Sequence, residues 1–123
     1  MAVKKKKITS AELANSIVQG IQEKKGYDIV EIDLRKIKNS ICDRFIICHG
    51  TNRTQVEAIA NNVRDFVKRE LGVGAWHAEG FENAEWILID YFDVVLHVFL
   101  PQSRDYYKLE ELWADADIRR IDA

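Results

Sequence analysis

The sequence predicts one domain of the α/β (α+β) class, with helices flanking a mixed five-stranded sheet. Helix-length segments, in which apolar residues recur at threes and fours, are interspersed with short strand-like runs of apolar residues. The links between them are short, which favours a single compact layered structure. A chain of 123 residues is long enough for one hydrophobic core.

The N-terminal half is predicted to hold a helix followed by two strands. Thr9 and Glu12 have the spacing of a capping box, and Gly26 can close the helix that begins there. Residues 27–34 alternate apolar and acidic side chains, which predicts a strand with one solvated face. The apolar run at residues 44–49 predicts the second strand.

A long helix is predicted to follow the second strand. Asn52 is a good N-cap, while Thr54 and Glu57 offer a competing capping box. Apolar side chains then repeat at threes and fours as far as Gly72, which can end the helix.

The C-terminal half is predicted to hold three strands and a helix. A short strand covers residues 75–78, and residues 86–99 read as a hairpin. Pro101 suits the first turn of a last helix that runs to Trp113.

We place the domain at residues 9–117, between a flexible basic N-terminal tail (1–8) and a C-terminal tail (118–123). The lysines of the first tail precede no apolar segment, so they do not form a secretory signal. No apolar run approaches the roughly 20 residues of a membrane helix. Cys42 and Cys48 are expected to be free thiols in a reducing, cytoplasmic setting.

Charge is unevenly distributed along the chain, although the net charge is only −2. Residues 1–78 hold 14 basic and 9 acidic side chains, whereas residues 79–123 hold 4 basic and 11 acidic ones. An acidic C-terminal third argues against contact of that third with a phosphate backbone. It favours a basic partner or a metal, and a simply solvated acidic surface is an equal alternative.

The hairpin "WILIDYFDVVLHVF" contains two aspartates near its tip. With Tyr91 and Phe92 as the turn, Asp90 is predicted to lie directly opposite Asp93, an arrangement of like charges that is destabilising. Two aromatic side chains would then be exposed at the tip. The alternative is a longer loop whose rings fold back onto the core.

The two faces of this hairpin are predicted to differ in character. One face is aliphatic and must belong to the core. The other face mixes carboxylates with the aromatic ring of Trp86 and the imidazole of His97, and such a mixed face often meets another surface. The aliphatic face contains Ile87, Ile89, Val94 and Leu96.

Residue patterns for catalysis, cofactors or metals are weak. Asp90 and Asp93 could hold Mg²⁺, with the turn at Gly50 as a phosphate cradle, which would suit a metal-dependent nucleotidyltransferase-like enzyme. The chain lacks the glycine-rich phosphate-binding motifs and any zinc-ligand spacing. We therefore assign no catalytic residue, cofactor or metal ligand.

Two linked motifs carry a resemblance to a known family. The pattern W-x3-DYxD-x3-H-x-F at residues 86–99 is followed by R-x2-Y-x-LE-x-LW at residues 104–113. With "DRFIICHGTNRTQVEAIANNV" at residues 43–63, these stretches resemble the Iojap-like ribosomal silencing factors (RsfS, or DUF143) of bacteria, plastids and mitochondria. Relatives often have glycine where this chain has Phe92.

The resemblance implies a non-enzymatic factor with a nucleotidyltransferase-like shape. Such a factor binds the fourteenth large-subunit ribosomal protein at the intersubunit face, blocks subunit joining and represses translation under nutrient limitation. A basic partner would relieve the repulsion between Asp90 and Asp93. Proximity to ribosomal RNA would suit the lysine tail, and the chain would be a monomer or a homodimer without membrane contact. The implied contact residues are Trp86, Asp90, Tyr91 and Asp93, with His97, Arg104 and Tyr107 as further positions.

Overall fold

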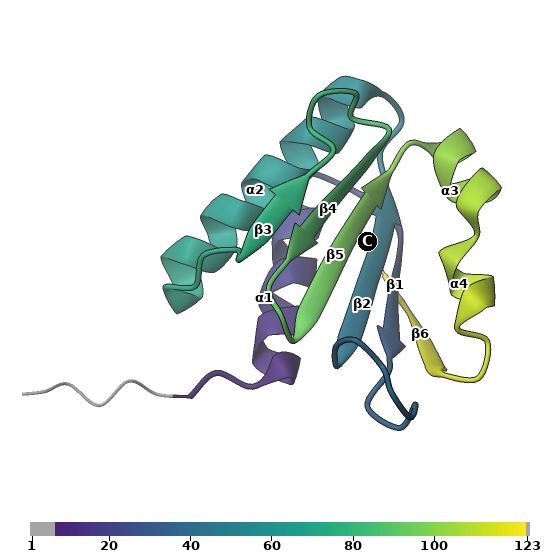
Figure 1. Cartoon of the computed structure of the whole chain (residues 1–123). Coiled ribbons are helices and arrows are strands. Elements are labelled where there is room, and N and C mark those ends of the chain that lie inside the picture. Colours follow the sequence, from purple (N-terminus) through teal and green to yellow (C-terminus); the bar gives the residue numbers. More distant parts are fainter. Residues whose placement is uncertain (1–6, 123) are drawn as a thin grey trace, which may run out of the picture.

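A computed structural model describes residues 7–122, so that most of the predicted basic tail lies outside the described residues. The described part folds into one mixed sheet with two helices on one face and two short helices at an edge of the other (Figure 1). Its elements are α1 (Ser10–Glu23), β1 (Tyr27–Asp33), β2 (Arg44–His49), α2 (Arg53–Leu71), β3 (His77–Glu79), β4 (Trp86–Asp90), β5 (Val94–Phe99), α3 (Pro101–Tyr107), α4 (Leu109–Leu112) and β6 (Asp117–Ile121).

The sheet has the order β3-β4-β5-β2-β1-β6. Strands β2 and β5 are parallel, and every other neighbouring pair is antiparallel, so the predicted fold class is confirmed. The predicted count of five strands is wrong, because Asp117–Ile121 adds the edge strand β6 from residues expected to form a tail. The charged "DIRRI" has little strand signal of its own and becomes a strand by pairing with β1.

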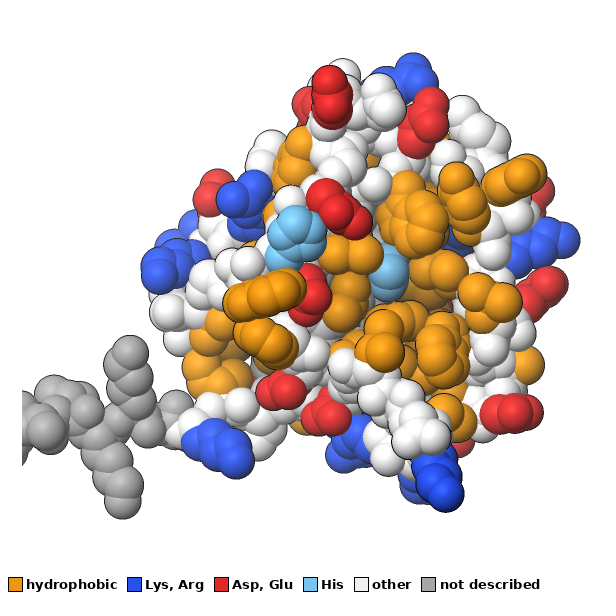
Figure 2. Space-filling view, in the orientation of Figure 1, with side chains coloured by type: hydrophobic (Ala, Val, Ile, Leu, Met, Phe, Trp, Pro, Cys, Tyr) orange, Lys and Arg blue, Asp and Glu red, His pale blue; other side chains and the backbone are white. Residues whose placement is uncertain are grey.

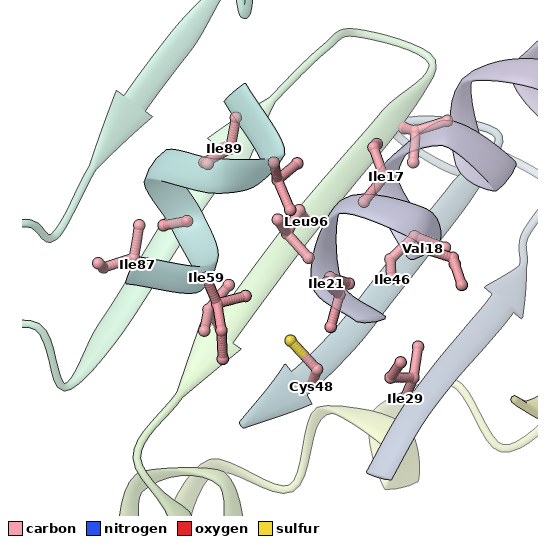
Figure 3. Close-up of a cluster of buried hydrophobic side chains, with 14 of the residues drawn as sticks. Ile17, Val18, Ile21, Ile29, Ile46, Cys48, Ile59, Ile87, Ile89 and Leu96 are labelled. Carbon is pink, nitrogen blue, oxygen red and sulfur yellow. The ribbon is translucent and has the colours of Figure 1, made fainter. Parts of the chain in front are cut away.

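Helices α1 and α2 cover one face of the sheet and enclose the larger core, which Figure 3 shows in close-up. The predicted capping box is present, since Thr9 Oγ1 accepts the Glu12 N–H at 3.1 Å. Asn52 caps α2 by accepting the Gln55 N–H at 2.8 Å. The two helices approach closely at Gly20, where a Cβ atom would lie 3.0 Å from a backbone carbon of α2.

A second, smaller core lies on the opposite face of the sheet. Helices α3 and α4 cover its β2 side, where Trp113 packs edge-on against Phe45 with ring centroids 5.8 Å apart. The predicted single last helix is broken at Lys108, which takes a left-handed φ of +47°. This break lets α4 turn back over the sheet while β3, β4 and part of β5 stay uncovered (Figure 1).

The predicted solvated face of β1 is wrong at Glu31, which is only 5% exposed. Its carboxylate pairs with Arg44 of β2 at 2.9 Å and with Arg119 of β6 at 3.2 Å. The neighbouring strands therefore supply the charges that make burial of this acid tolerable.

Two smaller predictions concern cysteine and the membrane. Cys42 and Cys48 are both buried free thiols, as predicted. No helix within residues 7–122 is long and apolar enough to cross a membrane.

Candidate partner-binding surface

The β4–β5 hairpin turns at Phe92 and Asp93, later in the chain than predicted. The Tyr91 N–H donates to the Val94 carbonyl at 2.9 Å, and the Asp93 N–H donates to the Tyr91 carbonyl at 2.9 Å. The predicted pairing of Asp90 with Asp93 is therefore wrong, because the strands pair two residues out of the expected register. A shift of two leaves each side chain on its predicted face.

Two sets of contacts fix the position of this turn. The Asp90 carboxylate accepts the Phe92 N–H at 2.7 Å, which supports the left-handed φ of +73° at Phe92. The Asp93 carbonyl accepts the N–H groups of Asp43 and Arg44 at 2.9 and 3.1 Å, which ties the turn to the start of β2. Asp90 thus serves the turn itself, and no opposed pair of carboxylates needs a partner to relieve it.

Tyr91 does not sit at an exposed tip, so this part of the hairpin prediction is wrong. Its side chain is 6% exposed and belongs to the core beneath α1 and α2, as the alternative with folded-back rings had it. Burial raises the pKa of Tyr91 to about 12, against a smaller opposing effect of the Arg64 charge. Phe92 does remain exposed, at 62% of its surface.

The uncovered face of β4 and β5 carries a cluster of aromatic side chains. The Trp86 ring lies 4.7 Å from Tyr107 of α3 and 5.0 Å from Phe99 of β5, measured between centroids. Hydrophobic side chains gather over this part of the molecule in Figure 2. We call this surface the open face and define it by Trp86, Leu88, Asp90 and Tyr107, with the buried rings of His97 and Phe99 beneath them.

His97 lies beneath the open face, only 4% exposed, and holds Trp86 in place. The Trp86 indole N–H donates to His97 Nδ1 at 3.0 Å, so a neutral His97 carries its proton on Nε2. Burial lowers the pKa of His97 to about 4. The histidine is therefore an uncharged acceptor that fixes the orientation of the partly buried indole ring.

A hollow of about 330 Å³ lies beside Trp86 on the same side of the sheet. Glu79, Gly80 and Leu88 form its remaining lining. Gly80 has a φ of +93°, and a Cβ atom there would collide with the Trp86 carbonyl, so only glycine fits. An apolar hollow with one carboxylate at its rim is suited to the side chain of a protein partner.

Arg104 lies away from this cluster, in a network that anchors α3 and α4 to the end of β1 and β2. Its guanidinium donates to Glu110 at 3.2 Å and to His49 Nδ1 at 2.9 Å. Burial, together with the Arg104 charge, lowers the pKa of His49. The side chain of Arg104 is only 11% exposed, so its contacts are those of a structural residue.

Comparison with known proteins now identifies the family. A family model described as "Ribosomal silencing factor during starvation" matches residues 7–123. The chain belongs to the RsfS family. It is 41% identical to ribosomal silencing factor RsfS of Halalkalibacterium halodurans over 109 residues, covering 89% of this chain and 92% of the relative. RsfS of Bacillus subtilis is 42% identical over 81% of this chain and 83% of its own.

Solved structures agree with this membership. A crystal structure of a Chromobacterium violaceum protein superimposes with a TM-score of 0.82 at 39% identity, covering 87% of this chain and 88% of the other. A crystal structure of a Bacillus halodurans protein superimposes with a TM-score of 0.75 at 37% identity, covering 93% of this chain and 100% of the other. The plastid branch appears as chloroplastic protein Iojap of Arabidopsis thaliana, 38% identical over 58% of this chain and 29% of that protein. The chain is thus a regulator of the ribosome by family.

The residues named for the enzyme alternative make contacts within the chain. Asp90 is engaged with the turn, and no group of three or more His, Cys, Asp or Glu side chains suited to a metal occurs in residues 7–122. At the Gly50 turn, the Thr51 N–H donates to Gln55 Oε1 at 2.7 Å. The backbone donor that would cradle a phosphate is therefore already used within the chain.

Only some of the predicted contact residues lie close together in the structure. Trp86, His97 and Tyr107 form one cluster, and Asp90 lies on the same side of β4 as Trp86. The alternation of the strand placed Leu88 on the same face as Trp86, but Leu88 was not named as a contact residue, and the hollow at Gly80 was missed. Tyr106 and Leu112, exposed on α3 and α4, were also missed.

Proposed function

We propose that this RsfS protein binds the large ribosomal subunit by placing its open face against a basic ribosomal protein. The fourteenth large-subunit protein is the partner that the family resemblance indicates. The bound chain then occupies space at the intersubunit face, prevents the small subunit from joining, and represses translation under nutrient limitation. This steric exclusion requires only that the bound chain overlaps the position of the small subunit, and it needs no catalytic group.

The single observation that carries the proposal is the open face itself. An indole ring, a tyrosine and a leucine lie together beside an apolar hollow, and aromatic side chains are typical anchors of protein interfaces. Glu79 lines the hollow and Asp90 lies on the same face of β4 as Trp86, in a third of the chain with 11 acidic and 4 basic side chains. Such a surface complements a partner rich in lysine and arginine.

The remaining details of the proposal follow from the same mode of action. The site of action is the cytoplasm, where subunits join. The chain acts without a cofactor, as a monomer or as a homodimer that leaves the open face accessible. The basic N-terminal tail, at residues 1–8, would lie close to ribosomal RNA in the complex.

Co-sedimentation with separated large subunits and with joined ribosomes tests the proposal. We expect binding to free large subunits, weakening as salt rises, and no binding when the small subunit is already joined. Equal binding to free and joined particles would rule out occlusion. No binding to either particle would reject the ribosome as the target.

Two variants locate the surface. Trp86→Ala should weaken binding by roughly 2–4 kcal/mol if the indole is the central anchor. Asp90→Asn keeps the oxygen that accepts the Phe92 N–H, so it removes charge without removing the turn contact. Its effect should be a smaller loss that fades at high salt. Glu57→Gln, on the exposed side of α2, is the matched charge control and should bind like the unchanged protein.

A further inference from the structure

A second hollow, of about 590 Å³, lies between α2 and the edge strand β3. It is separate from the open face, because α2 and the Asp90 side chain lie on opposite faces of the sheet. Ile89, which precedes Asp90, packs into the core with α1 and α2, so Asp90 points the other way. We call this hollow the α2–β3 pocket; its lining is Arg64, Asp65, Lys68, Gly74, Ala75, Trp76, His77, Ala78 and Phe81.

The most unusual side chain of the α2–β3 pocket is Trp76, which is 65% exposed. Its backbone N–H donates to the Asp90 carbonyl at 2.8 Å, which fixes the residue just before β3. Its ring leans on Phe92 with centroids 4.9 Å apart and on His77 at 6.0 Å. These two neighbouring rings thus support an indole that still presents most of its surface to solvent.

Two cations of α2 face the same pocket. The Arg64 guanidinium lies over the Phe81 ring, 5.4 Å from its centroid, which holds it in a defined position. Lys68 follows one helical turn later, on the same side of α2. Neither cation has a carboxylate within 4 Å among residues 7–122. Their charges are therefore available to an anionic ligand.

An exposed aromatic platform next to two unpaired cations is the arrangement that binds single-stranded nucleic acid. Every base has a π-face that can stack on an aromatic ring, and backbone phosphates pair with lysine and arginine. We propose that the α2–β3 pocket binds an unpaired nucleotide of RNA. The base stacks on Trp76, and the adjoining phosphates contact Arg64 and Lys68.

The charges around the pocket fit this assignment better than they fit a basic protein. Asp65 is the only acid in its lining, against the two cations Arg64 and Lys68, while the His77 ring is engaged with Glu79 at 3.1 Å. The acids of the open face lie across the sheet from α2, so a phosphate can approach Arg64 and Lys68 from the helix side. The chain would then have an acidic surface for protein and a basic pocket for RNA.

Fluorescence anisotropy with a dye-labelled oligoadenylate of about ten nucleotides tests the pocket with the full chain alone. Trp76→Ala should lower affinity between about fivefold and a hundredfold, the range for loss of one base-stacking ring. Trp76→Phe should restore most of it. Circular dichroism of each variant should match the unchanged protein, because Trp76 is largely exposed. Unaltered affinity in Trp76→Ala overturns the proposal.

The salt dependence of the same binding tests the two cations. For a single strand, removing two phosphate contacts should lower the slope of log affinity against log salt by about 1.4. We expect that change in the variant Arg64→Gln with Lys68→Gln. The matched control, Lys36→Gln with Lys38→Gln, removes equal charge from the loop after β1 and should keep the slope. An equal change in both variants would mean unspecific attraction and overturn the proposal.

Failure of the RNA-binding proposal can be distinguished from failure of the proposed docking on the ribosome. Oligoadenylate binding uses no ribosomal protein, so it can fail while large subunits still bind, and the reverse also holds. The rival occupant of the pocket is a protein. If Trp76→Ala weakens binding to RNA-free proteins extracted from large subunits and leaves oligoadenylate binding unchanged, the pocket takes protein and the RNA assignment is wrong.

Discussion

Two buried polar atoms of the hairpin lack hydrogen-bond partners within residues 7–122 and so affect the stability of the fold. The Tyr91 hydroxyl and His97 Nε2 are both buried without a hydrogen-bond partner among the described residues. Such groups lose hydration on folding and gain no bond in return, so each lowers the free energy of unfolding. They lie on opposite faces of the same two strands, one under the helices and one under the open face.

Removal of the Tyr91 hydroxyl should therefore not weaken the fold. We expect Tyr91→Phe to raise the free energy of unfolding by about 1 kcal/mol, the low end of the cost of an unpaired buried group. Tyr91→Ala should instead lower it by about 3–5 kcal/mol, because it leaves a cavity. Urea unfolding measures both. A clear loss of stability in Tyr91→Phe would show that the hydroxyl has a partner, such as a bound water.

His97 should make stability fall in mild acid. Burial lowers its pKa from 6.5 to about 4, so between these values the unfolded chain binds a proton that the folded chain does not. Stability is then full above pH about 6.5 and falls toward pH about 4, by up to about 3 kcal/mol in total. Urea unfolding at several pH values measures this slope.

A matched pair of variants isolates this histidine. His97→Asn keeps an acceptor for the Trp86 indole and removes the titrating group, so the pH slope in this window should become shallower. His77→Gln changes a half-exposed histidine on β3 and should leave the pH slope of stability unchanged. An unchanged slope in His97→Asn would assign the effect to another group, with His49 the first to examine.

At the scale of elements, β1 depends on both of its neighbours. Glu31 is buried between Arg44 of β2 and Arg119 of β6, and Arg44 also reaches Ser10 at the start of α1 at 3.1 Å. The Arg44 side chain is itself buried, whereas Arg119 is largely exposed. The inner arginine should therefore matter far more than the outer one, since solvent screens exposed pairs.

Breaking the inner pair should be severe. We expect Arg44→Met to lower the free energy of unfolding by about 3–5 kcal/mol, because it leaves the Glu31 carboxylate buried without its main partner. Arg119→Ala should cost less than about 1 kcal/mol. In a Glu31→Gln background, the cost of Arg44→Met should shrink markedly. Urea unfolding of the four chains of this cycle measures the coupling, and additive losses would contradict it.

Sequence patterns were sufficient where the deciding contacts are local. The Thr9 capping box, the Asn52 cap and the two faces of the hairpin all follow from neighbours in the chain, and all are present. The turn was misplaced because its position depends on Asp43 and Arg44, which lie some fifty residues earlier. Strand β6 was missed because only pairing with β1 makes a strand of "DIRRI". The contacts of Arg104 could not be predicted for the same reason, because its partners come from three other segments of the chain.

The two sides of the whole molecule expose different kinds of side chain. The side formed by α1 and α2 encloses the larger core, and its exposed residues are mostly polar. The side formed by β3, β4 and β5 has two short helices beside it (Figure 1), and Figure 2 shows hydrophobic side chains gathered there. On this side the partly buried Trp86 borders the hollow lined by Glu79, Gly80 and Leu88. If a ribosomal subunit docks on one side of the sheet, the backbone amides on the opposite side stay in contact with water.

Hydrogen–deuterium exchange of the chain on large subunits should report this asymmetry. Helices α3 and α4 are short and exposed, so their amides exchange readily in the unbound chain and should slow when a partner covers the open face. Exchange at the C-terminal end of α1, which ends at Glu23 on the opposite side of the sheet and far along the helix from the basic tail, should stay as in the unbound chain. Trp86→Ala should abolish the slowing in α3 and α4 at equal concentration. Slowing in α1 with none in α3 and α4 would place the ribosomal partner on the helical side and refute the open face as the docking surface.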